Sequence, residues 1–447
     1  MASESKIKNR TLLMLTNLCR LLLATMFIVS GFVKAVDPKG LLYKLQEYAS
    51  VFAPEASIDD SWLLMLALFI SAAEFVLGAM LLMGTCRRFS AIAVLAVMLL
   101  FTPWTLVLAI WNPVHDCGCF GDAIQLSNWA TFFKNVILLM MSAFLWVKRS
   151  RIVRFISTRG SWMVTLFALL YIGAVQYNGL VHLPIMDFRP FAIGADLNEG
   201  IREIPAEFKL IFRYEKNGEI LELDSEGAPD STWNYLGTRS DMISAGVPPQ
   251  IDNFYFSGMD GGDDISEKLL ADTNYICLLV ISDVRTADES RADKMNDIYD
   301  YCVDNDIQFY ALTSSLDDGV TMWRKHTGAE YPFYSADNLL LKTMIRSNPG
   351  LIVLKEGKVV AKWNVRDVPE LYAADDDTDS LVGYGDFYPW LKKMQGNNNI
   401  NSLFHWMFMF FTPLLLIFLV DLVLRRSEKE KSDVAATPKE QNEIKTE

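Results

Sequence analysis

The sequence predicts a membrane α-helical bundle of six transmembrane helices, joined to an extracytoplasmic α/β domain. Three observations lead to this fold class. Six apolar runs are long enough to span a bilayer, and the chain is 51% hydrophobic although its net charge is −13. The charge is also segregated, because residues 184–400 contain 38 Asp and Glu against 20 Lys and Arg, a net charge of −18 that leaves +5 for the remainder. With 447 residues, the chain is long enough for more than one domain.

Each apolar run reaches the roughly 20 residues that a helix needs to cross the hydrocarbon of a bilayer. The first four runs fall in residues 11–150, and we expect them to form a four-helix membrane domain after a short cytoplasmic N-terminus, residues 1–10. We expect the fifth span within residues 160–184 and the sixth over 403–424. Residues 425–447 are polar and lack aromatic side chains, which predicts a disordered cytoplasmic tail. The first run is too long for the apolar part of a signal peptide, so we expect no cleavable one.

Basic residues gather at the same end of every span. This charge bias marks the cytoplasmic side and predicts that both termini face the cytosol. Residues 184–402 and the loop with Cys117 and Cys119 then face outward, in a multi-pass protein of the bacterial inner (plasma) membrane whose first partner is the lipid bilayer. An acidic outward part argues against nucleic-acid binding, since phosphate recognition needs a basic surface. The basic clusters are Lys6, Lys8 and Arg10; Arg87 and Arg88; Lys148, Arg149, Arg151, Arg154 and Arg159; and Arg425 and Arg426.

Two cysteines, Cys117 and Cys119, stand one residue apart in a polar turn between two spans. Gly118 tolerates the tight bend between them. A disulfide closing so small a ring would be strained, and strained disulfides are the labile, oxidising ones. Such a bond persists in an oxidising compartment. The adjacent His115 could accept a proton or, as a cation, lower a thiol pKa. We therefore predict Cys117 and Cys119 as catalytic residues, with His115 auxiliary.

Three functions fit this turn. In the first, the cysteine pair cycles between dithiol and disulfide, exchanges with envelope client proteins that carry cysteines, and passes electrons to a membrane quinone; no motif supports the quinone. In the second, the protein is a non-enzymatic scaffold and the pair is a fixed clasp. In the third, His115, Asp116 and the two thiolates hold copper(I) or zinc; one histidine and no second cysteine cluster argue against it, so we expect no metal.

Each of the first two predicted spans contains one charged residue. Glu74 is near the middle of the second span, where a charge is usually paired or functional. Counting residues from the ends of the spans places Arg20 at a matching depth. We predict an intramembrane ion pair of Arg20 and Glu74 that fixes helix packing; a proton site beside a quinone is the alternative.

The loop after the first span begins with Asp37 and Pro38. A capping aspartate followed by proline at the first helical position starts a helix. Apolar residues then recur at helical spacing, which predicts a short helix on the membrane surface that shields the bundle.

Residues 10–150 resemble the DoxX/MauE group of four-helix membrane proteins. The resemblance rests on Arg20, on the segment from Ser30 to Lys34, on Asp37 and Pro38, on Glu74 with Gly78, and on Cys117-Gly118-Cys119-Phe120-Gly121, which is similar to the MauE cysteine signature. It implies a membrane component associated with thiol–disulfide chemistry or with the maturation of envelope redox proteins.

The outward part divides in two. Residues 185–250 are predicted as a β connector, with strands at 208–214 and 220–223 around Asn217-Gly218 and a loop over 225–250. Residues 251–395 alternate strands and helices, which predicts an α/β domain.

The element order of this domain resembles the thioredoxin fold, particularly TlpA-like members. The most specific feature is Pro349 before the strand 350–354, and the resemblance implies that an extended peptide docks beside Pro349. This sequence departs from the family because no Cys-x-x-Cys follows the strand 275–283. The domain is therefore predicted to be degenerate and unable to exchange dithiols itself. Cys277 and Cys302 read as buried small apolar residues, although a disulfide between them is open.

Overall fold

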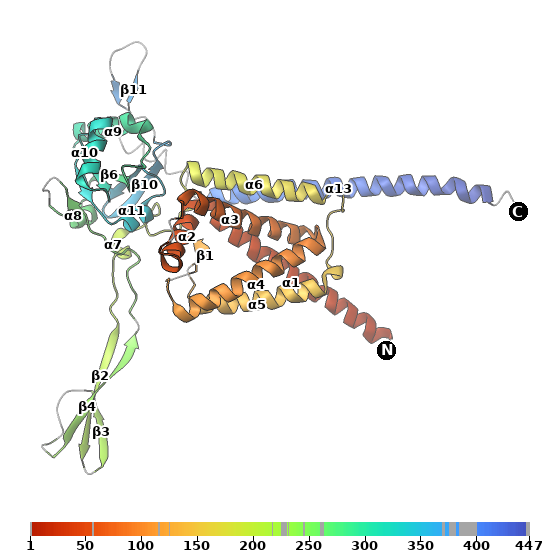
Figure 1. The fold of residues 1–447 in the computed structure, drawn as a ribbon, viewed down its shortest axis with the longest axis horizontal. Coiled ribbons are helices and arrows are strands. Elements are labelled where there is room, and N and C mark those ends of the chain that lie inside the picture. The colour runs from red at the N-terminus through yellow and green to blue at the C-terminus, as the bar shows by residue number, and fades with distance from the viewer. Residues whose placement is uncertain are drawn as a thin grey trace. The chain divides into compact units, whose positions relative to one another are not determined.

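The computed structural model describes residues 2–55, 58–114, 117–124, 126–216, 218–224, 230, 232–244, 246–259, 263–368, 372–374, 381–383 and 400–443. The chain divides into two compact units (Figure 1). One unit comprises Met1–Arg189 and Met394–Glu447, and the other comprises Pro190–Lys393. The first is helical and the second is an α/β unit, which confirms the predicted fold class.

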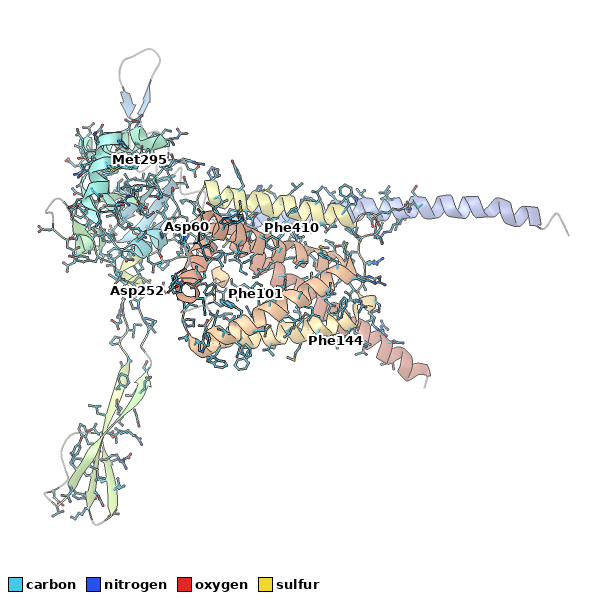
Figure 2. All side chains as sticks on the ribbon, viewed as in Figure 1. Asp60, Phe101, Phe144, Asp252, Met295 and Phe410 are labelled. Carbon is cyan, nitrogen blue, oxygen red and sulfur yellow. The ribbon has the colours of Figure 1, made fainter. Side chains whose placement is uncertain are left out.

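Within the described residues, the helical unit has six helices that are long and apolar enough to cross a membrane. Four of them, α1, α3, α4 and α5, form the predicted four-helix part, and α6 and α13 lie beside it (Figure 1). An aromatic cluster joins the added helices to the bundle: the ring of Phe410, which is labelled in Figure 2, lies 5.1 Å from that of Tyr171 and 4.9 Å from that of Phe75. The helices are α1 (Ala2–Val36), α3 (Asp60–Met83), α4 (Arg87–Trp111), α5 (Asn128–Val147), α6 (Ser161–Val181) and α13 (Ile400–Glu443).

The prediction of a disordered tail over residues 425–447 is wrong for most of its length. Helix α13 continues from the membrane span to Glu443, and residues 444–447 lie outside the described residues. Lys, Glu and Ala, which are frequent after Arg426, have high helix propensity, so a helix already nucleated by the apolar span can propagate through them.

Two glycines bring α1 and α3 into close contact. A Cβ atom on Gly31 of α1 would lie 2.5 Å from the backbone nitrogen of Phe75, and one on Gly78 of α3 would lie 2.7 Å from that of Ile28. Any larger residue would force the helices apart, since small residues are what allow membrane helices to approach closely. This contact sets the register in which α1 faces α3.

A short helix, α2 (Pro38–Phe52), follows α1 as the capping signal predicts. The Asp37 carboxylate accepts a hydrogen bond of 2.9 Å from the Gly40 backbone N–H. A second short element, β1 (Cys119–Asp122), lies between α4 and α5, at the same end of the helical unit as α2 (Figure 1). These two elements close that end of the four-helix part.

The α/β unit is built on a six-stranded sheet with the order β10-β9-β6-β7-β8-β5. Strands β6, β7 and β8 are parallel, whereas β9 and β10 form an antiparallel hairpin on β6. This is the arrangement of a thioredoxin-like domain, and the peptide bond between Asn348 and Pro349, just before β9, is cis. The elements are β5 (Ser257–Gly258), α8 (Ser266–Ala271), β6 (Tyr275–Ile281), α9 (Ala292–Asp304), β7 (Gln308–Thr313), α10 (Asp317–Thr327), β8 (Phe333–Ser335), α11 (Asn338–Met344), β9 (Gly350–Lys355) and β10 (Lys358–Asn364).

Residues 185–250 hold more structure than predicted. The expected strands are β2 (Glu207–Lys216) and β3 (Glu219–Leu223), but a third strand, β4 (Asn234–Ser244), forms where a loop was predicted. Gly and Ser content favoured a loop there, yet pairing along nearly the whole of β2 outweighs it. Within the α/β unit, the chain leaves the part built on the six-stranded sheet near the short helix α7 (Leu197–Gly200). It returns to that part at Gln250, whose N–H donates to the Gly200 carbonyl over 2.8 Å. The three-stranded sheet is thus an insertion.

Cys277 on β6 and Cys302 on α9 are both fully buried and are free thiols. A hydrogen bond to Cys302, together with burial, raises the pKa of the Cys277 thiol well above its usual value. Neither sulfur is exposed to a partner, which agrees with their interpretation as small core residues.

We expect Gly31→Ala to destabilise the helical unit by about 1–3 kcal/mol, the usual cost of overpacking. The reason is the 2.5 Å approach of its Cβ to the Phe75 backbone. Gly173→Ala in α6 is the matched control, because a Cβ there meets nothing within 4 Å. Thermal unfolding of the detergent-solubilised chain gives both values, and equal melting temperatures for the two variants would contradict the close contact of α1 and α3.

Candidate functional site

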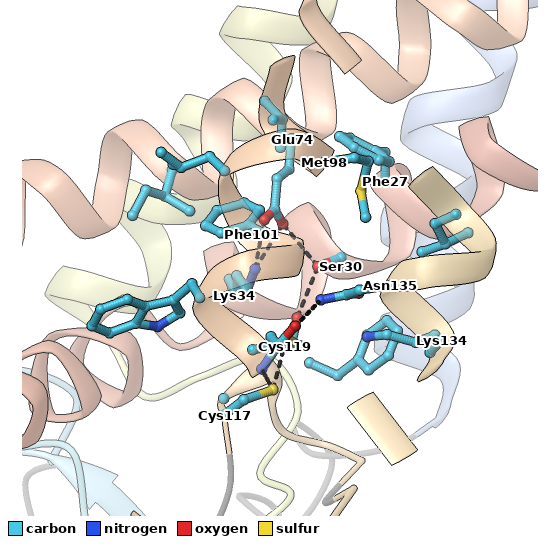
Figure 3. A pocket seen from close by; sticks show the side chains of 18 of the residues that line it. Phe27, Ser30, Lys34, Glu74, Met98, Phe101, Cys117, Cys119, Lys134 and Asn135 are labelled. Atoms are coloured by element: carbon cyan, nitrogen blue, oxygen red, sulfur yellow. Dashed lines mark hydrogen bonds and ion pairs between the residues drawn. The ribbon is translucent and has the colours of Figure 1, made fainter. Parts of the chain in front are cut away.

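The two cysteines of the turn lie against each other. The sulfur atoms of Cys117 and Cys119 are 2.7 Å apart, and both residues are free thiols (Figure 3). Gly118 between them has a φ of +61°, a conformation that side chains with a Cβ rarely adopt. The Tyr48 hydroxyl of α2 donates a 2.8 Å hydrogen bond to the Cys117 carbonyl and fixes the turn from above. The sequence-predicted pair is therefore brought together by the backbone of the turn itself.

The two thiols are not equivalent. A hydrogen bond from the Cys119 thiol lowers the pKa of Cys117 to about 6, although burial opposes the shift. The Cys119 backbone N–H, 3.3 Å from the Cys117 sulfur, and the Thr131 hydroxyl, at 3.6 Å, lower the pKa of Cys117 further. Donating that bond, and being buried, raises the pKa of Cys119 well above its usual value. Cys117 is thus a thiolate at neutral pH, and Cys119 is a protonated thiol beside it.

A cavity of about 600 Å³ opens from the cysteine turn into the four-helix part (Figure 3). Its wall is mostly apolar, with Phe27, Met98, Phe101 and Leu138 among the lining residues. The surface helix α2 contributes Leu41, Leu45 and Tyr48 to the same wall, so it covers the cavity as the sequence predicted for the bundle. Polar groups enter the cavity at few points: Ser30, Lys34, Glu74, Thr105, Lys134 and Asn135, together with Tyr48 and the two cysteines.

Glu74 forms its ion pair with Lys34. The Lys34 ammonium donates to the two Glu74 carboxylate oxygens over 2.7 and 2.8 Å, and both side chains are more than nine-tenths buried (Figure 3). The Ser30 oxygen lies 2.8 Å from the same carboxylate and 2.8 Å from the Cys119 carbonyl. A hydroxyl has one proton and can donate to only one of these acceptors at a time. Ser30 therefore lies between the buried ion pair and the cysteine turn, and its hydroxyl can donate its hydrogen bond either to the Glu74 carboxylate or to the Cys119 carbonyl.

The predicted ion pair of Arg20 and Glu74 is wrong. Arg20 lies towards the other end of the bundle, where its guanidinium donates to the Val153 carbonyl over 2.5 Å and stacks 4.9 Å from the centre of the Phe155 ring. Equal depth in two spans does not fix which residues face each other. The glycine contact sets that register and places Glu74 opposite the turn of α1 that contains Ser30, some ten residues beyond Arg20.

Sequence reasoning missed four residues that contact or flank the cysteines and Glu74. Ser30 and Lys34 are four residues apart, which puts them on one face of α1, and a lysine at the end of an apolar run was an available partner for Glu74. Thr131 and Lys134 share a face of α5 in the same way. The Lys134 ammonium lies 4.3 Å from the centre of the Phe120 ring, and its charge also favours the Cys117 thiolate.

The sequence also predicts roles for His115, Asp116 and Pro349. His115 and Asp116 lie outside the described residues, so neither the auxiliary role of His115 nor the metal alternative gains or loses support. Pro349 belongs to the α/β unit, where it is buried. The carbonyls on either side of its cis bond are already used: the Asn348 carbonyl accepts from the Asp288 N–H over 3.0 Å, and the Pro349 carbonyl accepts from the Ser347 hydroxyl. Peptide docking beside Pro349 stays a prediction.

The unequal thiols predict the pH dependence of alkylation. The rate at which iodoacetamide modifies Cys117 in the reduced chain should fall as the pH drops through about 6 and be flat above pH 7, because only the thiolate reacts. Cys119→Ala removes the main donor and should move the midpoint up, towards the usual cysteine value of about 8.5. Cys119→Ser keeps a donor and should move it less. Mass spectrometry of the peptide with Cys117 gives the rates, and an unmoved midpoint in Cys119→Ala would contradict the pairing.

A comparison with curated proteins found no match. One solved structure is described as "Solution structure of a putative protein disulfide isomerase from Bacteroides thetaiotaomicron". The match has 19% sequence identity and a TM-score of 0.21, and it covers 26% of this chain and 76% of that chain. This chain also has 10% identity over 32% of its length to 79% of a chain described as "Crystal structure of uncharacterized conserved protein from Geobacillus kaustophilus", with a TM-score of 0.23.

One family model matches the helical unit. It is described as "Methylamine utilisation protein MauE", and it matches residues 12–148. These residues include α1 from Leu12 onward, α2 to α5, the cysteine turn and every residue that lines the cavity. The part of the chain that holds the candidate site is therefore the part that is similar to MauE.

Proposed function

We propose that this membrane protein is a thiol–disulfide redox or maturation factor for envelope proteins, and that Cys117 and Cys119 carry its chemistry. The observation that supports this most strongly is the contact between a thiolate, Cys117, and a protonated thiol, Cys119, at the mouth of a cavity. A low-pKa cysteine with a second thiol beside it has the properties of a nucleophile and a resolving partner.

The exchange step follows from the two pKa shifts. In the oxidised form, a client thiolate attacks the Cys117–Cys119 disulfide and forms a mixed disulfide with Cys117, while Cys119 leaves as the thiol. A second client thiolate then attacks the client sulfur and releases Cys117, whose low pKa makes it a good leaving group. The client gains one disulfide, and the turn gains two electrons and one proton, because Cys117 is left as a thiolate; the client's other thiol proton goes to the solvent. Repeated turnover needs an acceptor for both.

The cavity fits an acceptor of the quinone class. Its wall is mostly apolar and aromatic, and among its polar groups Ser30 contacts the cysteine turn through the Cys119 carbonyl. A quinone bound there would take up the two electrons of the cysteine pair, the proton of Cys119, and a second proton from Glu74 or the solvent. Lys34 and Ser30 would hold polar atoms of the ligand in place by donating hydrogen bonds. Glu74 would exchange a proton with the bound ligand itself, because its carboxylate lines the cavity. This is the proton site that the sequence left as an alternative, with Lys34 in place of Arg20.

The proposal places the cysteine turn and residues 184–402 outside the cytosol, in a bacterial inner (plasma) membrane. The basic clusters lie at one end of the helical unit and support this orientation: Arg151 donates to Asn9, Arg87 to the Ser150 carbonyl, and Arg425 to the Phe155 carbonyl. The positive-inside rule assigns that end to the cytosol. The α/β unit, which lacks the family's Cys-x-x-Cys, would then dock the client and leave the chemistry to the turn.

Trapping in cells tests the proposal. In the Cys119→Ser variant the Cys117 thiolate can attack the disulfide of an oxidised client, which is the reverse of the second step above: a mixed disulfide forms and the client regains one thiol. No Cys119 thiol remains to resolve this bond towards the reduced client, so the variant should accumulate mixed disulfides, visible as band shifts on non-reducing gels that collapse with dithiothreitol. Cys117→Ser should accumulate far fewer, because the remaining cysteine has a raised pKa and is a poor nucleophile. Cys86→Ser, at an exposed cysteine elsewhere in the chain, is the control and should behave as wild type.

The same cells separate this function from the scaffold alternative. Quinone depletion should shift the wild-type pair towards the dithiol, as measured by mass-tagged maleimide. A pair that stays oxidised in every condition, with no mixed disulfide in either cysteine variant, would show a fixed clasp and overturn the proposal.

A further inference from the structure

A second cavity, of about 630 Å³, lies at the end of the helical unit that carries the basic clusters. Four of its eight lining residues are arginines: Arg87, Arg88, Arg149 and Arg154. No carboxylate lines it, and among the described residues none of the four arginines is paired with one. Four guanidinium groups around one hollow repel each other unless an anion lies between them.

Three of the four arginines are held in place by contacts that leave donors free, and Arg154 donates to the Thr158 hydroxyl over 3.2 Å. Arg87 donates to the Ser150 and Ile152 carbonyls over 3.0 and 2.9 Å, which ties the start of α4 to the segment after α5. The Arg149 guanidinium donates to the Trp146 carbonyl over 2.9 Å and stacks 4.1 Å from the centre of that ring. A guanidinium has five N–H donors, so these bonds account for only part of its capacity. The cavity is therefore lined by several positively charged guanidinium N–H groups that make no hydrogen bond to the described residues.

The same cavity has an apolar side. Phe89 and Val147 line it, and they are 60% and 64% exposed. Phe89 is in the first turn of α4, and Val147 is the last residue of α5, so the cavity lies where two spans meet the membrane boundary. A ligand that fills it must combine an anionic group with an apolar body. Guanidinium forks match phosphate oxygens, and basic pockets between membrane helices suit anionic lipid head groups.

We propose that this arginine cavity binds the phosphate group of an anionic phospholipid, with the acyl chains against Phe89 and Val147. The bound phosphate neutralises the repulsion among the four guanidinium groups and holds the start of α4 against the end of α5. The site does not depend on the cysteine chemistry.

The test uses the full chain in phosphatidylcholine nanodiscs with and without phosphatidylglycerol, read by native mass spectrometry and by thermal unfolding. Wild type should retain phosphatidylglycerol in preference to phosphatidylcholine and should melt at a higher temperature with it. Inorganic phosphate at the same concentration should give neither effect. Absence of a preference for phosphatidylglycerol in wild type, or equal protection by inorganic phosphate, would overturn the proposal.

A pair of double variants separates a site from general surface charge. Arg88→Gln with Arg154→Gln removes two exposed cavity arginines and should lower the retention of phosphatidylglycerol at least tenfold, with an unchanged melting temperature in phosphatidylcholine alone. Arg10→Gln with Arg426→Gln removes the same charge from exposed positions that do not line the cavity, and should retain the lipid as wild type does. An equal loss in both double variants would overturn the proposal, because diffuse attraction would then explain the binding.

Discussion

The close contact of α1 and α3 is the constraint on which the candidate site depends. Gly31 and Gly78 let the two backbones approach, and only in that register do Ser30 and Lys34 meet Glu74. A buried carboxylate without a partner would cost several kcal/mol, and losing one member of such a pair costs about 3–5 kcal/mol. The ion pair and the glycines therefore support each other. The close packing at the glycines brings Lys34 and Glu74 together, and their ion pair stabilises that packing. Ser30 extends the arrangement to the cysteine turn.

The proposed function divides the features of a thiol–disulfide system between the two units. The α/β unit has a thioredoxin-like sheet and the cis bond at Pro349, but its only cysteines within the described residues are Cys277 and Cys302, which are buried in its core. The helical unit has an accessible cavity with a low-pKa thiol. A clasp would need no such difference between the two thiols. The split pKa values, more than the spacing of the cysteines, favour exchange over a structural bond.

Much of the fold follows from the sequence, because hydropathy and turn chemistry are local signals. The six spans, the helix after Asp37 and the order of the α/β elements are all predictable in this way. Register is a tertiary property, so counting residues from span ends paired Glu74 with Arg20 and overlooked Lys34. Likewise, β4 forms because it pairs with β2. The part of α13 after Arg426 is helical because it continues the helix of the apolar span. The unequal pKa values depend on a 2.7 Å contact that no spacing shows.

The most direct test of the redox account is the reaction of the purified, reduced chain with a short-chain ubiquinone analogue under anaerobic conditions. Absorbance follows the quinone, and mass-tagged maleimide counts the thiols at Cys117 and Cys119. The account predicts one quinol formed per chain as both thiols are lost, none in Cys117→Ser, and slower formation in the double variant Lys34→Met with Glu74→Leu, whose Cys117 still alkylates normally. A small disulfide reagent serves as the control that the two thiols of the wild-type chain can be oxidised. If that reagent oxidises them but the quinone analogue yields no quinol, the redox account is contradicted.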